Sequence, residues 1–333
     1  MRGFFKLVLA NLTAIFILCA GFFIFFIGFL IISSISEGVD VKQDSVLTLD
    51  LKTRIIDSPS EDQEDIFAFK NEQTAVLLYD VINAIDRAKN DNKIKGISLE
   101  IDNFQAGMTQ MDDIRNALTD FKKSGKFVYA YGNTVSQGAY YLGSVADKYY
   151  LNPAGLIELK GLSTEVTFFK NFAEKYGIGI QVIRHGKFKA AVEPFLRDEI
   201  SPENKEQLST LLNDIWANTS KKIADSRKIS LPELNMITDS LYSYLPNLSL
   251  KYKLADQLIQ KSEYDNIIRK KLNIDADKKI NKISFAKYSE SLESENDGKK
   301  IAVLYASGAI YNGKGYDGIY AENFVKEIKK IQK

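Results

Sequence analysis

The chain has 333 residues, of which 45% are hydrophobic, so it is long enough to hold more than one buried core. Its 44 Lys and Arg residues nearly balance its 43 Asp and Glu residues, and it has no basic block with interleaved aromatic side chains, which argues against nucleic-acid binding. A single cysteine, Cys19, and a single histidine, His185, exclude an intrachain disulfide, a thiolate metal site and a multi-histidine metal centre within this sequence.

A long apolar segment dominates the N-terminus. Residues 7–32 are apolar apart from a few small or polar side chains, and about 20 apolar residues suffice to span the hydrocarbon core of a bilayer. A cleaved signal peptide is the alternative, but its apolar region is shorter, about 7–15 residues. Arg2 and Lys6 precede the segment and acidic residues follow it, so the positive-inside rule places the N-terminus in the cytoplasm. We therefore predict a single-pass anchor over residues 1–38, in which Cys19 is an ordinary packing residue.

Alternating strand and helix patterns follow the anchor. Residues 46–51 alternate like a half-buried strand, residues 77–89 have apolar positions at helical spacing, and a strand is expected at 94–101. The pattern continues with helices around 112–123 and 137–146 and strands at 127–130 and 148–151. Such alternation implies an α/β fold with a largely parallel sheet flanked by helices. We predict that this domain occupies residues 45–277.

The C-terminal third contains a helix, a polar tract and a restart of the pattern. Ser201-Pro202-Glu203 is a helix start signal, so a long amphipathic helix is predicted over residues 201–227. The polar tract 278–299 is expected to be a linker. Residues 301–311 resemble the first strand region and residues 322–333 resemble the first helix, which indicates that a second copy of the domain begins at residue 300. One strand and one helix cannot bury both faces of a parallel sheet, so the natural protein is expected to be longer.

The segment 185–201 contains the candidate catalytic lysine. It places Lys187 and Lys189 beside an apolar Ala-Ala-Val stretch. Burial disfavours the charged form of a lysine, so it lowers the pKa and can make the amine a general base. On composition alone, the alternative is favoured that both lysines are solvated and pair with Glu193 or Asp198.

The same segment resembles the lysine motif of signal peptide peptidase A (protease IV). In that motif a lysine followed by Ser/Ala-Ala-Val-Glu-Pro-Phe activates a serine, and the match falls on Lys189. The resemblance covers roughly residues 45–333. It extends to further motifs in the family's order, which are Gly132-Asn-Thr-Val-Ser-Gln-Gly-Ala-Tyr-Tyr141, Asn152-Pro153, Gly161 and Ser201-Pro202. It implies a ClpP/crotonase-like α/β superhelix of ββα units, preceded here by one transmembrane helix and partly repeated from residue 300.

The resemblance also distributes the catalytic residues between repeats. Long members take the general-base lysine from the first repeat and the serine from the second, in an Ala-Ser-Gly-Gly-Tyr type motif that this sequence does not reach. In the first repeat Gln137 stands at the equivalent position, and Ser136 before it is interpreted as a helix N-cap. The counterpart of the oxyanion loop, residues 103–107, carries bulky side chains, so a degenerate, structural site is expected there. Lys189 is therefore the one catalytic residue that we assign.

The function implied is that of a serine endopeptidase with a Ser-Lys dyad that degrades cleaved signal peptides. The implied location is the bacterial inner membrane, single-pass, with the soluble domain on the periplasmic or extracytoplasmic side. No cofactor or metal is implied, and the implied partners are peptide substrates, membrane lipid and further copies of the chain in a homo-oligomer. His185 is expected to be incidental, and Tyr140 and Tyr141 are expected to pack in the core.

Two alternatives stay open. The first is a catalytically incomplete membrane scaffold or oligomerisation domain of the same fold. The second is an acyl-CoA enzyme of the crotonase type, against which the apolar N-terminus and the Lys189 motif both argue.

Overall fold

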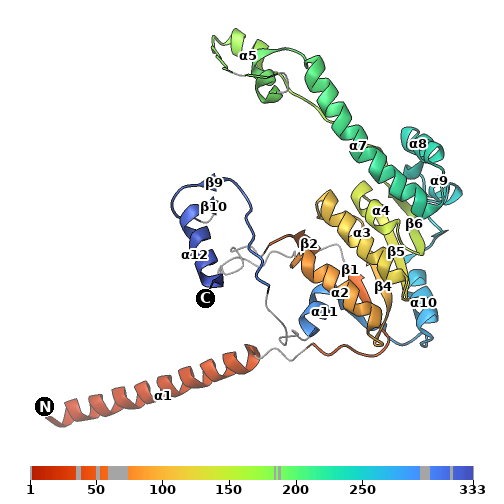
Figure 1. The fold of residues 1–333 in the computed structure, drawn as a ribbon. Coiled ribbons are helices and arrows are strands. Elements are labelled where there is room, and N and C mark those ends of the chain that lie inside the picture. The colour runs from red at the N-terminus through yellow and green to blue at the C-terminus, as the bar shows by residue number, and fades with distance from the viewer. Residues whose placement is uncertain are drawn as a thin grey trace. The chain divides into compact units, whose positions relative to one another are not determined.

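A computed structural model describes residues 2–34, 39–49, 53–58, 74–183, 185–186, 189–292, 301–315 and 318–332 (Figure 1). Its contacts divide the chain into two units, residues 1–41 and 42–333.

The first unit is the helix α1 (Arg2–Ser34). Its residues Leu9–Phe26 have a mean hydropathy of 2.3, and none of this stretch is buried within the protein. The helix is long and apolar enough to cross a membrane, and a signal sequence has the same properties. The expected helical segment is therefore present, and its role as an anchor stays a prediction.

The second unit is built on a parallel sheet with the strand order β7-β6-β5-β4-β1-β8, in which every neighbouring pair is parallel. The strands are β1 (Ser45–Leu49), β4 (Ile94–Glu100), β5 (Phe127–Val135), β6 (Lys148–Ile157), β7 (Gln257–Leu258) and β8 (Lys282–Ser284). Helices connect them, including α2 (Leu78–Asn90), α3 (Met108–Lys122) and α4 (Gln137–Gly143). The predicted α/β fold with a largely parallel sheet is confirmed.

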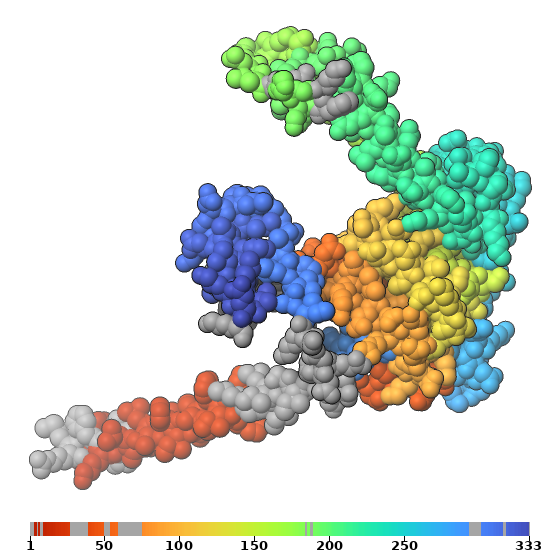
Figure 2. Space-filling model, in the orientation of Figure 1, coloured from red at the N-terminus to blue at the C-terminus, as the bar shows by residue number. Residues whose placement is uncertain are grey.

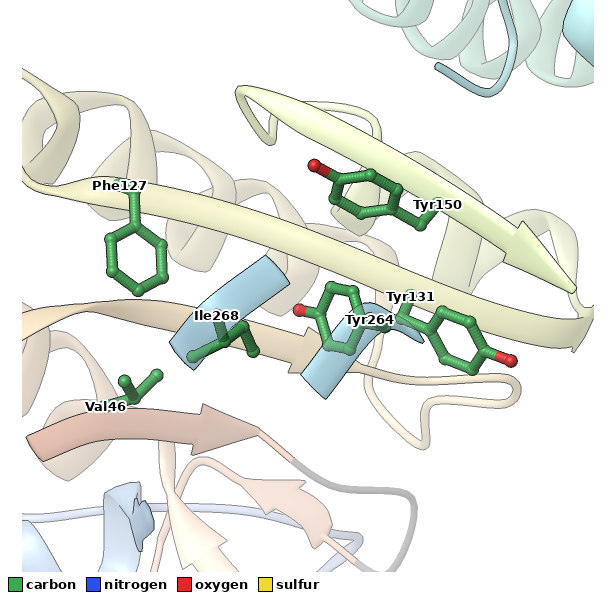
Figure 3. Packing of buried hydrophobic residues seen from close by; sticks show 6 residues of the cluster. All are labelled: Val46, Phe127, Tyr131, Tyr150, Tyr264 and Ile268. Atoms are coloured by element: carbon green, nitrogen blue, oxygen red, sulfur yellow. The ribbon is translucent and has the colours of Figure 1, made fainter. Parts of the chain in front are cut away.

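One face of the sheet is covered by α10 (Lys261–Leu272). Tyr264 and Ile268 of this helix are buried against strand residues that project from the same face (Figure 3). The ring of Tyr264 lies 5.1 Å from that of Tyr131 and 5.4 Å from that of Tyr150, between centroids. Such aromatic pairs bury large apolar areas and fix the helix on the sheet.

The long helix predicted after Ser201 is α7 (Pro202–Arg227), and the Ser201 side chain accepts a hydrogen bond from the Asn204 amide as an N-cap. Further helices surround it in the sequence. They are α5 (Lys170–Lys175), a short 3₁₀ helix at Ala190–Val192, α6 (Glu193–Leu196), α8 (Leu231–Asp239), a 3₁₀ turn at Tyr242–Tyr244 and α9 (Pro246–Lys251).

Regular structure also occurs inside the tract expected to be a linker. Strand β8 pairs with β1, and α11 (Phe285–Ser291) follows it at once. Phe285 and Tyr288 are buried, and the Tyr288 hydroxyl donates to Asp91 at 2.9 Å. The few apolar residues of this polar tract therefore complete the edge of the sheet.

The two ends of the second unit contain similar local structures. Near its start, β2 (Thr53–Ile56) pairs in parallel with β3 (Thr74–Leu77), and α2 begins at the next residue. Near its end, β9 (Ile310–Tyr311) pairs in parallel with β10 (Ile319–Tyr320), and α12 (Ala321–Ile331) begins at the next residue. This likeness agrees with the internal resemblance seen in the sequence, and the predicted second repeat stays a prediction.

Candidate active-site segment

The candidate lysine lies in a segment that leaves the sheet after β6 and returns as α7. We call residues 161–200 the lysine segment. Beyond α5 and α6 it contains little regular structure, and it ends directly before α7 (Figure 1). The first half of α7 is mostly solvent-accessible on the visible face (Figure 2), whereas Ile223 and Ala224 near its end are buried. The lysine segment is thus joined to the domain chiefly by the second half of α7 and by its own first residues.

Lys189 lies directly before the 3₁₀ helix Ala190–Val192, and its side chain is exposed. It lines an open cavity of about 420 Å³ together with Val182, Ile183, His185 and the Ala-Ala-Val stretch. Most of these neighbours are apolar, as the sequence indicated, and Ile183 is 97% exposed. The chain therefore surrounds Lys189 with apolar side chains but does not bury it.

Glu193, four residues after Lys189, is the best-buried charged group of this region. Its side chain is 1% exposed. Its carboxylate accepts hydrogen bonds from the Ser201 hydroxyl at 2.6 Å, the Ser201 amide at 3.3 Å and the Asn204 side-chain amide at 3.1 Å. A carboxylate at a helix N-terminus is also favoured by the positive end of the helix dipole. Glu193 thus ties the turn that follows Lys189 to the start of α7.

Gln137 ties the other end of the lysine segment to the sheet. Its Oε1 accepts from the backbone amides of Lys160 at 3.0 Å and Gly161 at 2.9 Å, and its Nε2 donates to the Gly161 carbonyl at 3.0 Å. The preceding Ser136 accepts from the Ala139 amide, which confirms its predicted role as an N-cap. At the position expected for a nucleophile in the first repeat, the chain therefore has a side chain that binds its own backbone.

Two charged contacts fix the second half of α7. Arg115 is buried and donates to the Tyr141 carbonyl, the Ser144 hydroxyl, the Lys222 carbonyl and the Ser226 hydroxyl. Lys222 donates to both carboxylate oxygens of Asp112, at 2.6 Å for the second oxygen. Burial alone would raise the pKa of Asp112, but hydrogen bonds from Lys222 and Tyr141 and the nearby charges of Lys222 and Arg115 hold the pKa below its usual value.

The loop at 103–107 is engaged in contacts within the chain. Phe104 is buried, and the Gln105 carbonyl accepts from the Ile55 amide at 3.0 Å in β2. The Gly107 amide, which an oxyanion hole would direct at substrate, donates instead to the Gln110 side chain at 2.7 Å. These contacts agree with the expectation of a structural rather than catalytic loop.

The structure places the other singled-out residues as follows. Tyr140 and Tyr141 are buried, and their hydroxyls donate to the Leu254 carbonyl at 2.9 Å and to Asp112 at 2.7 Å, so they pack in the core as expected. Burial raises the pKa of both phenols. Lys187 lies outside the described residues. Within the described part of the chain, no group of His, Cys, Asp and Glu side chains is arranged to hold a metal ion.

Comparison with known proteins places this region in a family. Residues 120–275 match the model of peptidase family S49, and this stretch contains Gln137, Lys189 and Glu193. The chain carries a peptidase S49 domain.

The relatives of this S49 chain are longer than it is. Protease 4 from Salmonella typhi is 33% identical over 89% of this chain and 51% of its own length. The chloroplastic serine protease SPPA of Arabidopsis thaliana is 29% identical over 88% of this chain and 43% of its own length. The chain thus spans about half the length of the curated relatives it matches. A solved structure, the 1510-N membrane-bound stomatin-specific protease, aligns with 73% of this chain at 13% identity and a TM-score of 0.37.

Sequence reasoning assigned Lys189 but missed how it is held. Glu193 was considered only as an ion-pair partner of the lysines, whereas it binds the N-terminus of α7. A carboxylate eight residues before a helix N-cap was the available signal. Gln137 gave no signal, because its partners at Lys160 and Gly161 come close only when β5 and β6 are paired.

Proposed function

We propose that this chain supplies the general-base lysine of a membrane-anchored S49 serine peptidase that cleaves peptides, with Lys189 as the base. The position of Lys189 carries the proposal. It lies in the stretch that matches the S49 model, inside an apolar cavity, on a turn that buried Glu193 ties to α7. The names of the relatives, Protease 4 and serine protease SPPA, support peptide hydrolysis as the reaction.

The proposed chemistry transfers a proton twice. A neutral Lys189 Nζ accepts the hydroxyl proton of a serine as its Oγ attacks the peptide carbonyl, and the resulting ammonium returns a proton to the leaving amine. In deacylation the amine takes a proton from water, which attacks the acyl-serine. We expect the serine in the part of the relatives that this chain does not span, since Gln137 occupies the corresponding position here.

The exposure of Lys189 sets a condition on this mechanism. A solvated lysine is protonated at neutral pH and cannot act as a base, because its ordinary pKa is about 10.4. Desolvation has to come from protein that covers the cavity around Ile183 and Ala190–Val192. We infer that the serine-bearing surface, from the same chain or from another copy in a homo-oligomer, supplies this cover.

Substrate and location form the finer part of the proposal. The apolar helix α1 would hold the domain at a membrane, with the domain outside the cytoplasm. Cleaved signal peptides are apolar and are left in the bilayer, so they would reach such an enzyme. Peptides and membrane lipid are the proposed partners.

The test is hydrolysis of an apolar peptide by the full-length protein carrying Lys189→Ala. We expect a fall in kcat of about 10²–10⁴-fold, the usual contribution of a general base. Lys175→Ala, in the same segment, is the matched control and should keep full activity. A fluorophosphonate probe that labels an activated serine should label the control and not Lys189→Ala. Full activity of a folded Lys189→Ala would reject the assignment.

The scaffold alternative is favoured by one observation. The loop 103–107 and Gln137 are both bound to their own chain, so the described residues contain no complete catalytic site. If the full-length protein neither hydrolyses peptide nor reacts with the probe, the scaffold function replaces the peptidase.

A further inference from the structure

A second cavity lies at the opposite end of α7 from the lysine segment. It has a volume of about 520 Å³ and lies between the C-terminal ends of α7 and α9 and the start of β6. The 26 residues of α7 separate it from the lysine segment by about 39 Å, at 1.5 Å per residue. It is therefore distinct from the proposed peptidase site.

The cavity is strongly basic. Its lining includes five basic and two acidic residues, a balance of +3. The basic residues are Lys122, Lys148, Arg227, Lys228 and Lys253, and the acidic ones are Asp147 and Asp256. The negative ends of α7 and α9 offset this by about one charge, at roughly half a charge each, so the cavity stays positive.

The two carboxylates are already occupied by neighbours. Asp256 accepts from the Tyr149 amide at 2.8 Å, from Arg227 at 2.9 Å and from Lys148 at 3.2 Å. Asp147 likewise accepts from the Val128 amide and from a lysine, Lys122. These contacts use three of the five cations and hold both carboxylates at the wall.

Lys228 and Lys253 are the remaining cations. Among the described residues, no carboxylate lies within ion-pair distance of either ammonium group. Both residues have left-handed backbone conformations, with φ of 55° and 60°. Glycine takes this conformation after a helix without steric cost, and a lysine does not.

The buried Arg227 organises this pair. Its side chain is 6% exposed, its Nη2 bonds Asp256, and its Nε donates to the Lys253 carbonyl at 2.9 Å. Lys228 follows Arg227 directly in the chain. One buried guanidinium thus sets the backbone on which both lysines are presented to the cavity.

We propose that this cavity binds a compact anion of the phosphate class, held by the ammonium groups of Lys228 and Lys253. Such an anion would form charge-assisted hydrogen bonds with both groups. It could be free phosphate or the headgroup of an anionic phospholipid. The second source rests on the proposed membrane anchor, whereas the site itself does not depend on the peptidase function.

The experiment follows acetylation of individual lysines by an amine-reactive reagent, measured by mass spectrometry on the full-length protein in phosphatidylcholine nanodiscs. Inorganic phosphate, compared with chloride at equal ionic strength, should slow acetylation of Lys228 and Lys253 and leave exposed Lys221 unchanged. Nanodiscs that contain phosphatidylglycerol, without added phosphate, test the lipid source through the same two lysines. Protection by phosphate alone identifies a free anion, and protection by phosphatidylglycerol identifies a headgroup.

A matched pair of variants tests the assignment independently. Lys228→Gly with Lys253→Gly removes both charges and suits the left-handed backbone, so the fold should be kept. We expect phosphate to bind this double variant roughly tenfold more weakly, by calorimetry. Asn273→Gly makes the same backbone change at another left-handed position, φ 55°, without removing a charge, and should bind as before.

Three results would overturn the proposal. They are equal acetylation of both lysines under all conditions, equal phosphate affinity in the double variant and the unsubstituted protein, and an unchanged peptide-bound anion affinity only in a misfolded sample would not be among them because folding is checked by circular dichroism. The lysines would then serve only to offset the helix dipoles. Peptide hydrolysis is expected to be the same in the double variant, so this outcome is separate from that of the proposed function.

Discussion

Glu193 illustrates how a buried carboxylate can position a catalytic group without touching substrate. It is bonded to Ser201 and Asn204 at the start of α7, and Lys189 lies less than one turn before the 3₁₀ helix that leads to it. Removing one partner from a buried hydrogen-bonded set leaves the others unsatisfied, which costs about 1–3 kcal/mol per group. The placement of Lys189 should therefore depend on Glu193.

We predict that Glu193→Ala destabilises the start of α7 locally by about 1–3 kcal/mol and lowers peptidase activity, with Glu193→Gln intermediate because it keeps one acceptor oxygen. Hydrogen exchange of the amides at Ser201–Lys205 measures the local effect. Glu203→Gln, an acid in the first turn of the same helix, is the control and should change little. Unaltered exchange at these amides in Glu193→Ala would show that the contact has no structural role.

Local patterns predicted some residues of the site and missed others. Ser136 and Ser201 were predicted as N-caps because a cap depends on the residues that follow it in sequence, and both are confirmed. The exposure of Lys189 could not be predicted, because the adjacent Ala-Ala-Val stretch describes the chain and not what packs over it. Gln137 and Arg115 bind groups far away in sequence, so no local pattern contains their partners.

Among the secondary-structure elements, the long and periodic ones were predicted and the short ones were not. The helix α7 and the central strands β4, β5 and β6 follow clear apolar periodicity. Strand β8 and helix α11 lie in a tract whose charge content suggested a linker. They form because Ile283, Phe285 and Tyr288 find apolar partners at the edge of the sheet, which is a tertiary effect.

The contact between α3 and α7 predicts a dependence of stability on pH. Because the pKa of Asp112 is lowered in the folded state, its contribution is present above the unfolded pKa and is lost as pH falls through the folded value. Both Asp112 and Lys222 are about one-third exposed, at 33% and 39%, so we expect only about 0.5–1 kcal/mol. Loss should occur below about pH 4, where aspartate in the unfolded chain titrates.

Urea unfolding followed through Trp216, the sole tryptophan and part of α7, measures this effect. The unsubstituted protein should lose stability between about pH 6 and about pH 3 more steeply than Asp112→Asn, which cannot titrate there. Asp225→Asn removes an exposed ion pair with Lys221 on the same helix and is the control. Equal slopes in Asp112→Asn and the unsubstituted protein would contradict the assignment.

At the scale of the whole molecule, the chain combines an apolar helix with an α/β domain that carries the S49 match. The two units demand different solvents, because α1 exposes large apolar side chains along its length while the second unit buries its own. Exposed apolar surface on this scale indicates a partner, and lipid is the partner that a helix of this length fits.

The anchor prediction can be tested on the full-length protein in a bacterial host. Membranes washed with alkaline carbonate should retain the protein, and deletion of residues 2–34 should release it into the soluble fraction. Because Arg2 and Lys6 precede the apolar stretch, protease added to spheroplasts should digest the domain and spare a cytoplasmic marker protein. Mass spectrometry of the retained protein should find the N-terminus intact. A mature chain that begins after the apolar stretch would identify a cleaved signal sequence instead, and the domain would then need another route to the membrane.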